Sequence, residues 1–303
     1  MAAITAKAPA KINLTLDIIG KREDGYHELR MIMQTIDLCD RLTFQAVAEP
    51  GICLAMERPL PDGCPVERNL VYRAAEQMWE RYHLPGGIRI YLEKHIPAAA
   101  GLAGGSTDCA AALAAINALY HLELSTEELC RIGVTLGADV PFCICQGTML
   151  SEGIGEVLTP LPSLPPVWVL LIKPDIAVST GYVYSHYDQG KVSAHPDTEG
   201  VVDAIRHKDA AAAARQLSNV LESVTIPAYP VIQEIKEFLE REGAVGSLMS
   251  GSGPTTYGLY QDEIRAQMAY RQAQAVYPDY DVILCQARIP ERFPDAPGAL
   301  AKQ

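Results

Sequence analysis

The sequence predicts an α+β fold of two domains, and three observations support this prediction. The chain has 303 residues, about twice the usual domain length of roughly 150 residues. A proline cluster over residues 160–166 (PLPSLPP) divides it near the middle. Beyond this cluster the expected elements follow the order β-α-β-β-α-β, which is typical of a ferredoxin-like domain. We therefore expect a first domain over residues 1–160, a second over 161–290 and a tail over 291–303.

The alternation of apolar and polar residues predicts the first strand. Over residues 11–18, Ile12, Leu14, Leu16 and Ile18 share one face, and the polar face begins with Lys11. Periodicity and helix caps predict the other elements of the first domain. The strands fall over residues 31–36, 41–47 and 88–94, and a further strand follows Asp139. One helix begins at Asn69, a second spans 107–120, and a third runs from a capping box at Ser125 to near Gly137.

The second domain is predicted from the same signals. Its strands fall over residues 167–172, 245–249, 255–260 and 282–286, and its helices over 200–222, 229–241 and 262–276. When the two helices between the first and second strands are counted as one, the elements follow the order β-α-β-β-α-β, which is the split β-α-β order.

Charge and composition exclude several classes of protein. With 25 Lys and Arg against 37 Asp and Glu, the formal net charge is −12, which argues against a protein that coats nucleic acid or an anionic membrane. We find neither an apolar run of transmembrane length nor a secretory signal, so we expect a cytoplasmic protein that binds no membrane and no nucleic acid. The eight cysteines form no CxxC pair, and we expect them to be reduced.

A glycine-rich loop is the most informative segment. Gly101, Gly104 and Gly105 lie between a predicted strand and a predicted helix. Glycine allows a close approach of the backbone to a ligand, and the free N–H groups of a helix N-terminus attract an anion. The loop is neither a GxxxxGK[ST] phosphate loop nor a dinucleotide GxGxxG loop. It indicates a phosphate site, or a loop that only packs its helix tightly.

Four other features have an ordinary structural interpretation beside a functional one. A strand lysine such as Lys11 commonly faces water, and an aspartate between a helix and a strand, such as Asp139, commonly forms a turn. Residues 24–27 (DGYH) form a turn with an aromatic ring and an imidazole at its tip. Residues 250–254 (SGSGP) connect two strands, and their backbone N–H groups could also contact phosphate.

Taken together, three segments resemble the signature motifs of the GHMP kinases, which include galactokinase, homoserine kinase, mevalonate kinase and phosphomevalonate kinase. These segments are residues 9–14 (PAKINL), 97–106 (PAAAGLAGGS) and 250–254 (SGSGP). The resemblance spans residues 6–288. It is closest to the branch that phosphorylates a methylerythritol carrying a cytidine diphosphate, in the non-mevalonate route to isoprenoids; the features that narrow it are DGYH, NLV over 69–71 and GADVPF over 137–142.

The resemblance implies a fold and a reaction. The first domain would be similar to ribosomal protein S5, the second would be ferredoxin-like, and the active site would lie in the cleft between them. The enzyme would move the γ-phosphoryl group of ATP, with Mg²⁺, to the 2-hydroxyl of the methylerythritol unit of a small-molecule substrate.

The resemblance also implies a role for each matching residue. Lys11 and Asp139 match the catalytic pair, and Asn13 matches a substrate-binding position. The remaining matches are listed by role: for the cytidine end, Tyr26, His27, Thr180 and Tyr184; for ATP, Lys94, Pro97, Ala98, Ala99, Ala100, Gly101, Leu102, Ala103, Gly104, Gly105, Ser106 and Thr107; and for the turn near the phosphates, Gly251, Ser252 and Gly253.

The predicted chemistry requires little covalent help from the protein. Phosphoryl transfer depends on in-line positioning and on neutralising the charge of the transferred group. No two-carboxylate metal site is visible in the sequence, so we expect Mg²⁺ to arrive with ATP, and Ser106 is a candidate hydroxyl ligand. Cys143 and Gln146 depart from the family pattern, and we expect them to affect the shape of one pocket wall. Two alternatives are another GHMP small-molecule kinase, for homoserine, mevalonate or a sugar, and a catalytically silent member that binds nucleotide.

Overall fold

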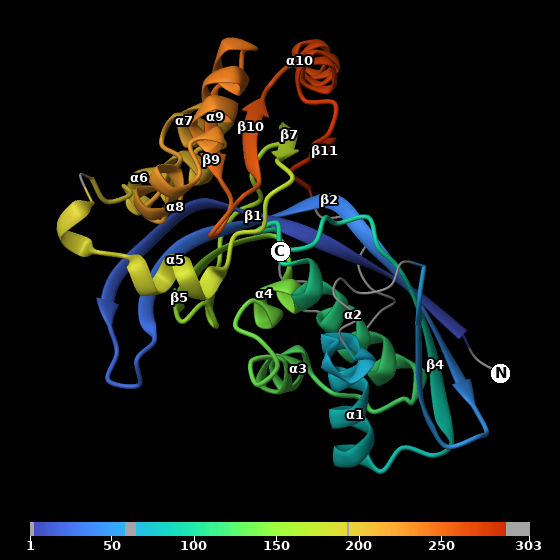
Figure 1. The fold of residues 1–303 in the computed structure, drawn as a ribbon. Coiled ribbons are helices and arrows are strands. Elements are labelled where there is room, and N and C mark those ends of the chain that lie inside the picture. The colour runs from blue at the N-terminus through green and yellow to red at the C-terminus, as the bar shows by residue number, and fades with distance from the viewer. Residues whose placement is uncertain (1–2, 58–64, 193, 289–303) are drawn as a thin grey trace.

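The computed structural model describes residues 3–57, 65–192 and 194–288. Two β-sheets organise these residues (Figure 1). Sheet A runs across the middle of the molecule, with one layer of helices on one side and sheet B with its helices on the other (Figure 1). This two-part α+β arrangement agrees with the predicted fold class. The predicted residue bounds of the two domains stay a prediction, and the expected tail over 291–303 lies outside the described residues.

Sheet A contains seven strands, and two long ones form its centre. β1 (Ala3–Lys21) and β2 (His27–Val47) pair in antiparallel fashion. One half of β2 pairs with β4 (Gly87–Glu93), which pairs in parallel with β3 (Gly51–Met56). The other half pairs with β5 (Thr148–Gly153), which pairs with β6 (Val157–Pro160). The short β8 (Ser218–Asn219) adds a parallel neighbour to β1, although it comes from the second half of the chain.

Four helices lie on one side of sheet A. α1 (Leu70–Tyr82) and α2 (Gly104–Leu119) pack against each other, and α3 (Thr126–Gly133) and α4 (Val140–Cys145) complete the layer. The predicted caps are confirmed, because Asn69 caps α1 and Ser125 forms a capping box with Glu128 at α3. α2 is buried almost all round, and its small alanine side chains allow this close packing.

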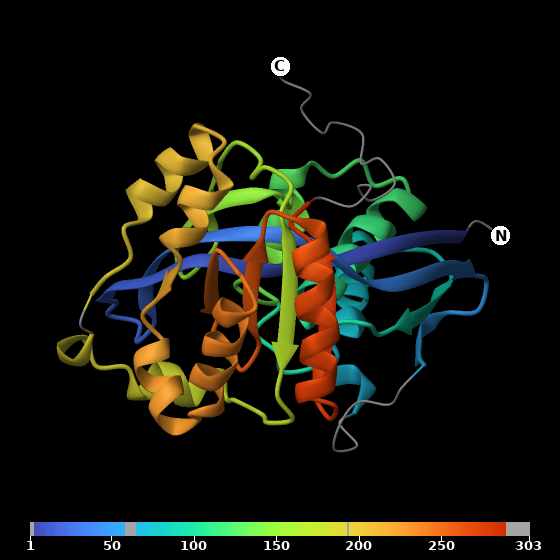
Figure 2. The ribbon, with the colours of Figure 1, turned by 90° about the horizontal axis from the view of Figure 1, so that it is seen from above.

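Sheet B is antiparallel, in the order β11-β7-β10-β9, with β7 (Trp168–Lys173), β9 (Gly246–Met249), β10 (Thr256–Tyr260) and β11 (Asp281–Gln286). α9 (Val231–Arg241) and α10 (Glu263–Val276) cover one of its faces (Figure 2). The other face packs Val169 and Leu171 together with Ile12 and Leu14 of sheet A. The remaining helices of this half are α5 (Thr180–His186), α6 (Thr198–Arg206), α7 (Ala210–Arg215) and α8 (Glu222–Ala228).

Three local predictions are wrong. The residues after Asp139 form helix α4 rather than a strand, because Pro141 suits the first turn of a helix. The two strands predicted over 31–36 and 41–47 are one continuous strand, β2, and the helix predicted over 200–222 is broken into shorter helices with β8 between them.

The described helices are all too short or too polar to cross a lipid bilayer.

Candidate active site

Two irregularities in β1 set the direction of its polar side chains. The register with β2 shifts between Pro9 and Lys11 and again between Asn13 and Thr15. Residues before and after these shifts, such as Ala8 and Leu16, pack in the core beneath the helices, whereas Ile12 and Leu14, between them, pack against sheet B. Because side chains alternate along a strand, Lys11 and Asn13 point to the helix side. A β-bulge commonly redirects a side chain in this way. The prediction that Ile12, Leu14, Leu16 and Ile18 share one face is therefore wrong.

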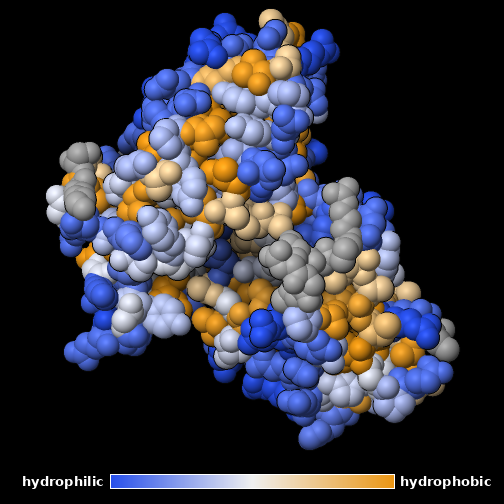
Figure 3. Space-filling model, viewed as in Figure 1, coloured by the Kyte–Doolittle hydropathy of each residue, from blue (hydrophilic) through white to orange (hydrophobic). Residues whose placement is uncertain are grey.

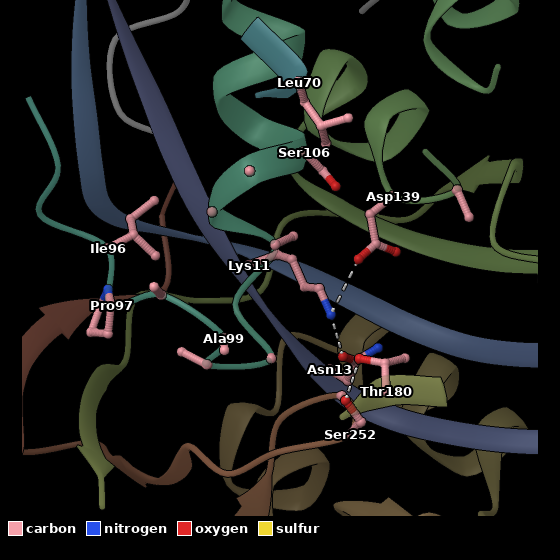
Figure 4. Close-up of a pocket in the computed structure, with 18 of the residues that line it drawn as sticks. Lys11, Asn13, Leu70, Ile96, Pro97, Ala99, Ser106, Asp139, Thr180 and Ser252 are labelled. Atoms are coloured by element: carbon pink, nitrogen blue, oxygen red, sulfur yellow. Dashed lines mark hydrogen bonds and ion pairs between the residues drawn. The ribbon is translucent and has the colours of Figure 1, made fainter. Parts of the chain in front are cut away.

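Lys11 and Asp139 meet in the cleft. Asp139 lies directly before α4, and its carboxylate Oδ2 is 3.8 Å from Nζ of Lys11. Nζ also donates to Oδ1 of Asn13 at 2.7 Å. The Lys11 side chain is 6% exposed and that of Asp139 is 31% exposed, so the lysine is enclosed and the carboxylate is accessible. Figure 4 shows the two side chains pointing toward each other from β1 and from the start of α4.

The glycine-rich loop is held open above the start of α2. Gly101 has φ +73°, and a Cβ at that position would lie 2.1 Å from the carbonyl oxygen of Ser250, so only glycine fits. The loop is tied on both sides, because Lys11 N–H donates to the carbonyl of Leu102 and Ser250 Oγ donates to that of Gly101. In the described part of the chain no side chain caps α2. Its first N–H groups therefore face the cleft unpaired, as an anion site requires.

The cleft has a volume of about 1480 Å³, which exceeds the usual range of roughly 300–1000 Å³ for one ligand. Figure 3 shows a hollow on this face between the two halves of the molecule. The walls include Lys11, Asn13, Asp139 and most of the loop over 97–106. Of the residues predicted to bind ATP, Leu102 and Thr107 do not line the cleft, and both side chains are buried.

Lys94 is enclosed by two carboxylates. Its Nζ is 2.7 Å from Oδ2 of Asp108 and also contacts Oδ2 of Asp40. Burial opposes the charge of the ammonium, but the two carboxylates prevail and raise the pKa of Lys94. Burial also raises the pKa of the Asp108 carboxyl well above its ordinary value, more than Lys94 lowers it. Lys94 lines the cleft, and its predicted contact with ATP stays a prediction. Its charge is already balanced by carboxylates that were not identified from the sequence.

Aromatic side chains line the end of the cleft that lies away from the glycine-rich loop. His27 lies 5.5 Å from Tyr184 and 6.1 Å from Tyr187, between ring centroids, and Tyr26 beside it is 61% exposed. Burial lowers the pKa of His27, which favours the neutral imidazole. Tyr187 was not predicted, although its spacing of three residues from Tyr184 is close to one helical turn. Its hydroxyl oxygen is buried and has no hydrogen-bond partner among the described residues.

The turn over residues 250–254 closes the cleft between these two ends. Ser252 Oγ is 2.9 Å from Oγ1 of Thr180, and Asn219 Nδ2 donates to the carbonyls of Met249 and Gly251. Gly251, Ser252 and Thr180 line the cleft, whereas Gly253 does not. Asn219 fixes the turn and was not identified from the sequence.

Cys143 and Gln146, the two departures from the family pattern, are both buried, and neither lies among the residues that line the cleft. Neither side chain therefore forms part of the cleft surface, and their effect on the shape of a pocket wall stays a prediction. Gln146 instead ends α4, with φ 56°.

Two models of one protein family match this chain, one in each half. The family model described as "GHMP kinases N terminal domain" matches residues 69–147, which include the loop, the start of α2 and Asp139. The model described as "GHMP kinases C terminal" matches residues 201–279, which include the turn over 250–254. The fold and the cleft are thus those of a two-domain small-molecule kinase.

Individual relatives show to which kinases within this class the chain is similar. The chain is 48% identical over 284 residues to a 4-diphosphocytidyl-2-C-methyl-D-erythritol kinase of Lachnospira eligens, covering 91% of this chain and 98% of the relative. It is 50% identical over 271 residues to the kinase of the same name from Acetivibrio thermocellus, covering 89% and 94%. A crystal structure of 4-(cytidine 5'-diphospho)-2C-methyl-D-erythritol kinase superposes with a TM-score of 0.79 at 35% identity, covering 93% of this chain and 98% of that one. The chain belongs to the GHMP kinases and, within them, to the family of the 4-diphosphocytidyl-2-C-methyl-D-erythritol kinases.

Proposed function

We propose that this protein transfers the γ-phosphoryl group of ATP to the 2-hydroxyl of 4-diphosphocytidyl-2-C-methyl-D-erythritol, in the cytoplasmic non-mevalonate route to isoprenoid precursors. One observation carries the proposal. The Lys11–Asp139 pair stands in a single cleft whose other walls are an uncapped helix N-terminus and a group of aromatic rings. The helix N-terminus therefore suits a phosphate donor, and the aromatic rings suit an acceptor that carries a nucleoside. The Lys11–Asp139 pair would lie where these two substrates meet.

The triphosphate end of ATP fits the loop over residues 97–106. The unpaired N–H groups at Gly104, Gly105 and Ser106 can donate to phosphate oxygens, and the helix dipole favours their negative charge. The side chains of this loop are small, so the backbone can approach the ligand closely. Because Lys94 is paired with Asp40 and Asp108, we assign it to holding the loop and the nucleotide wall in place.

The cytidine end of the acceptor fits the aromatic rings. A cytosine ring can stack on Tyr26 or Tyr184, and neutral His27 has one donor and one acceptor nitrogen for the edge of the base. This arrangement gives a physical reason for the aromatic and imidazole side chains after β1. A homoserine, mevalonate or sugar acceptor carries no base that would use them.

Asp139 and Lys11 would act on the attacking hydroxyl. The accessible carboxylate of Asp139 can accept a hydrogen bond from the 2-hydroxyl, orient it toward the γ-phosphorus and take its proton as the bond to phosphorus forms. Lys11, held by Asn13, keeps Asp139 in position and stabilises the negative charge that develops on the transferred oxygens. Positioning and charge stabilisation supply most of the catalysis in phosphoryl transfer.

Mg²⁺ fits this site as an ion carried by the nucleotide. The described residues offer no cluster of three His, Cys, Asp or Glu side chains that could hold a metal, and Mg²⁺ commonly binds through substrate phosphates and one or two protein oxygens. The hydroxyl of Ser106, which lines the cleft near Asp139 (Figure 4), and the carboxylate of Asp139 are the oxygens that would hold it. Bound there, the ion would neutralise charge on the phosphates.

A panel of acceptors tests the proposal. The purified protein is incubated with ATP, Mg²⁺ and, separately, the cytidylyl methylerythritol, homoserine, mevalonate or galactose. We expect ATP consumption and a phosphorylated product with the cytidylyl acceptor, and no reaction above background with the others. A kcat/KM for another acceptor that equals or exceeds the cytidylyl value would overturn the assignment. No ATP consumption with any acceptor would support the catalytically silent alternative.

A further inference from the structure

Two cysteines outside the cleft have their sulfur atoms in contact. Cys130 in α3 and Cys145 at the end of α4 are partly exposed, and their Sγ atoms are 3.7 Å apart. Neither takes part in the reaction described above. We propose that Cys130 and Cys145 form a redox modification site, in which a small-molecule disulfide such as oxidised glutathione converts them to an intramolecular disulfide that ties α3 to α4 and slows phosphoryl transfer.

The geometry favours closure of this disulfide. A disulfide requires sulfur atoms about 2.05 Å apart, so the two atoms must approach by less than 2 Å, which side-chain rotation with a small helix shift can supply. Both thiols project from helices that already pack together. Cys53, in contrast, is exposed on β3, and among the described residues it has no sulfur partner in hydrogen-bonding range.

The two thiols have different reactivities. A hydrogen bond from Cys130 lowers the pKa of the Cys145 thiol, and the same contact, followed by burial, raises the pKa of Cys130. Because the thiolate is the nucleophile, Cys145 is the attacking group and Cys130 the resolving one.

Atoms and electrons balance in two exchange steps. The Cys145 thiolate attacks one sulfur of the small disulfide, so that a mixed disulfide forms and one small thiolate leaves. Cys130 then loses its proton and attacks Cys145 sulfur, forming the protein disulfide and releasing the second small thiolate. The protons of the two cysteines pass, through solvent, to the two released thiolates. The protein is oxidised by two electrons and the small disulfide is reduced by two.

The position of the pair links oxidation to the active site. The segment between Cys130 and Cys145 contains Asp139, which lies directly before α4. A disulfide would fix both ends of this segment and shift α4 toward α3. Asp139 stands at 3.8 Å from Lys11, and a misplacement of about 1 Å at a reacting group can cost up to about 10²-fold in rate.

Oxidation of the full chain tests the proposal. The reduced protein is incubated with oxidised glutathione, and its free thiols are then alkylated for mass mapping. We expect a disulfide joining the peptides that contain Cys130 and Cys145, and no glutathione retained on either. We expect kcat to fall about tenfold or more and to recover with dithiothreitol. The mass readout does not depend on catalysis, so it distinguishes failure of this inference from failure of the proposed function.

Three single variants complete the test. Cys130→Ser and Cys145→Ser should each lose the disulfide and keep their kcat under oxidation, whereas Cys53→Ser, the matched control, should behave like the wild-type protein. Cys130→Ser should retain glutathione at Cys145, and this trapped mixed disulfide identifies the attacking thiol. The proposal is overturned if both cysteines remain free, if either pairs with another cysteine, or if the disulfide forms with kcat unchanged.

Discussion

Nζ of Lys11 lies 3.8 Å from Oδ2 of Asp139, within the range of an ion pair but too far for a hydrogen bond. Nζ is instead bonded to Asn13 at 2.7 Å. The carboxylate is therefore held near the lysine and still has free acceptor positions toward the cleft. This arrangement suits a carboxylate that must receive a substrate hydroxyl, and four predictions follow from it and from the groups around it.

The first prediction concerns Asp139. Asp139→Asn keeps the shape of the side chain but removes the proton acceptor, so we expect kcat to fall by about 10²-fold or more with little change in the KM for ATP. Steady-state kinetics with the cytidylyl acceptor measure this loss. Thermal unfolding serves as the control for folding, and a kcat close to that of the wild type would exclude the proton-acceptor role.

A double-mutant cycle extends this test. If Lys11 and Asp139 act as a unit, Lys11→Met combined with Asp139→Asn should cost less in kcat than the product of the two single losses. Independent, multiplicative effects would contradict the pairing.

The second prediction concerns Tyr26. Tyr26→Ala removes an exposed ring that can stack on cytosine, so we expect the KM for the cytidylyl acceptor to rise up to about tenfold, the scale of one aromatic contact, while the KM for ATP stays constant. Tyr91→Ala is the control, because Tyr91 is also exposed but lies outside the residues that line the cleft. An unchanged acceptor KM in Tyr26→Ala would remove Tyr26 from the binding site.

The third prediction concerns the unpaired hydroxyl of Tyr187. We expect this group to bond to the nucleoside half of the acceptor, so Tyr187→Phe should raise the acceptor KM about three- to tenfold. The melting temperature should not fall, because the hydroxyl has no hydrogen-bond partner in the part of the chain that the structure describes.

Tyr182→Phe is the matched control for Tyr187. Tyr182 stacks on His186 with ring centroids 4.0 Å apart, and it is not among the residues that line the cleft. A loss of stability without a change in acceptor KM in Tyr187→Phe would show a structural role instead.

The fourth prediction concerns pH and stability. Burial raises the pKa of Asp108 above its unfolded value of 3.8, so the folded state binds the proton more tightly than the unfolded chain. This contribution to the free energy of unfolding is complete below the unfolded pKa and is lost as the pH rises through the folded pKa.

Asp108→Asn has no carboxyl to ionise, so the melting temperature of the wild type relative to this variant should fall as the pH rises from about 4 to neutral, whatever offset the lost contact with Lys94 adds. Thermal unfolding across this range measures the difference. The exposed Asp203→Asn is the control and should follow the wild-type profile. A difference that is constant with pH would show that Asp108 does not titrate as expected.

The sequence by itself determined the local features of this protein. Caps such as Asn69 and Ser125 depend on neighbouring residues, and the glycines of the loop over 97–106 mark a close backbone approach wherever the loop lies. The order of the motifs was sufficient to identify the family. The strands and helices predicted for the second half of the chain were sufficient to predict the ferredoxin-like order of that half. These signals are local because caps and turns are stabilised by contacts between residues close in the chain.

Only the tertiary structure decided how the site is assembled. The bulges in β1 place Leu16 and Ile18 on the same side of sheet A as Lys11, where simple alternation predicted the opposite side, and these bulges depend on pairing with β2. The enclosure of Lys94 requires Asp40 from β2 and Asp108 from α2, and the contact between Cys130 and Cys145 depends on how α3 packs on α4. Such long-range contacts follow from packing around a common core, so residue spacing along the chain does not reveal them.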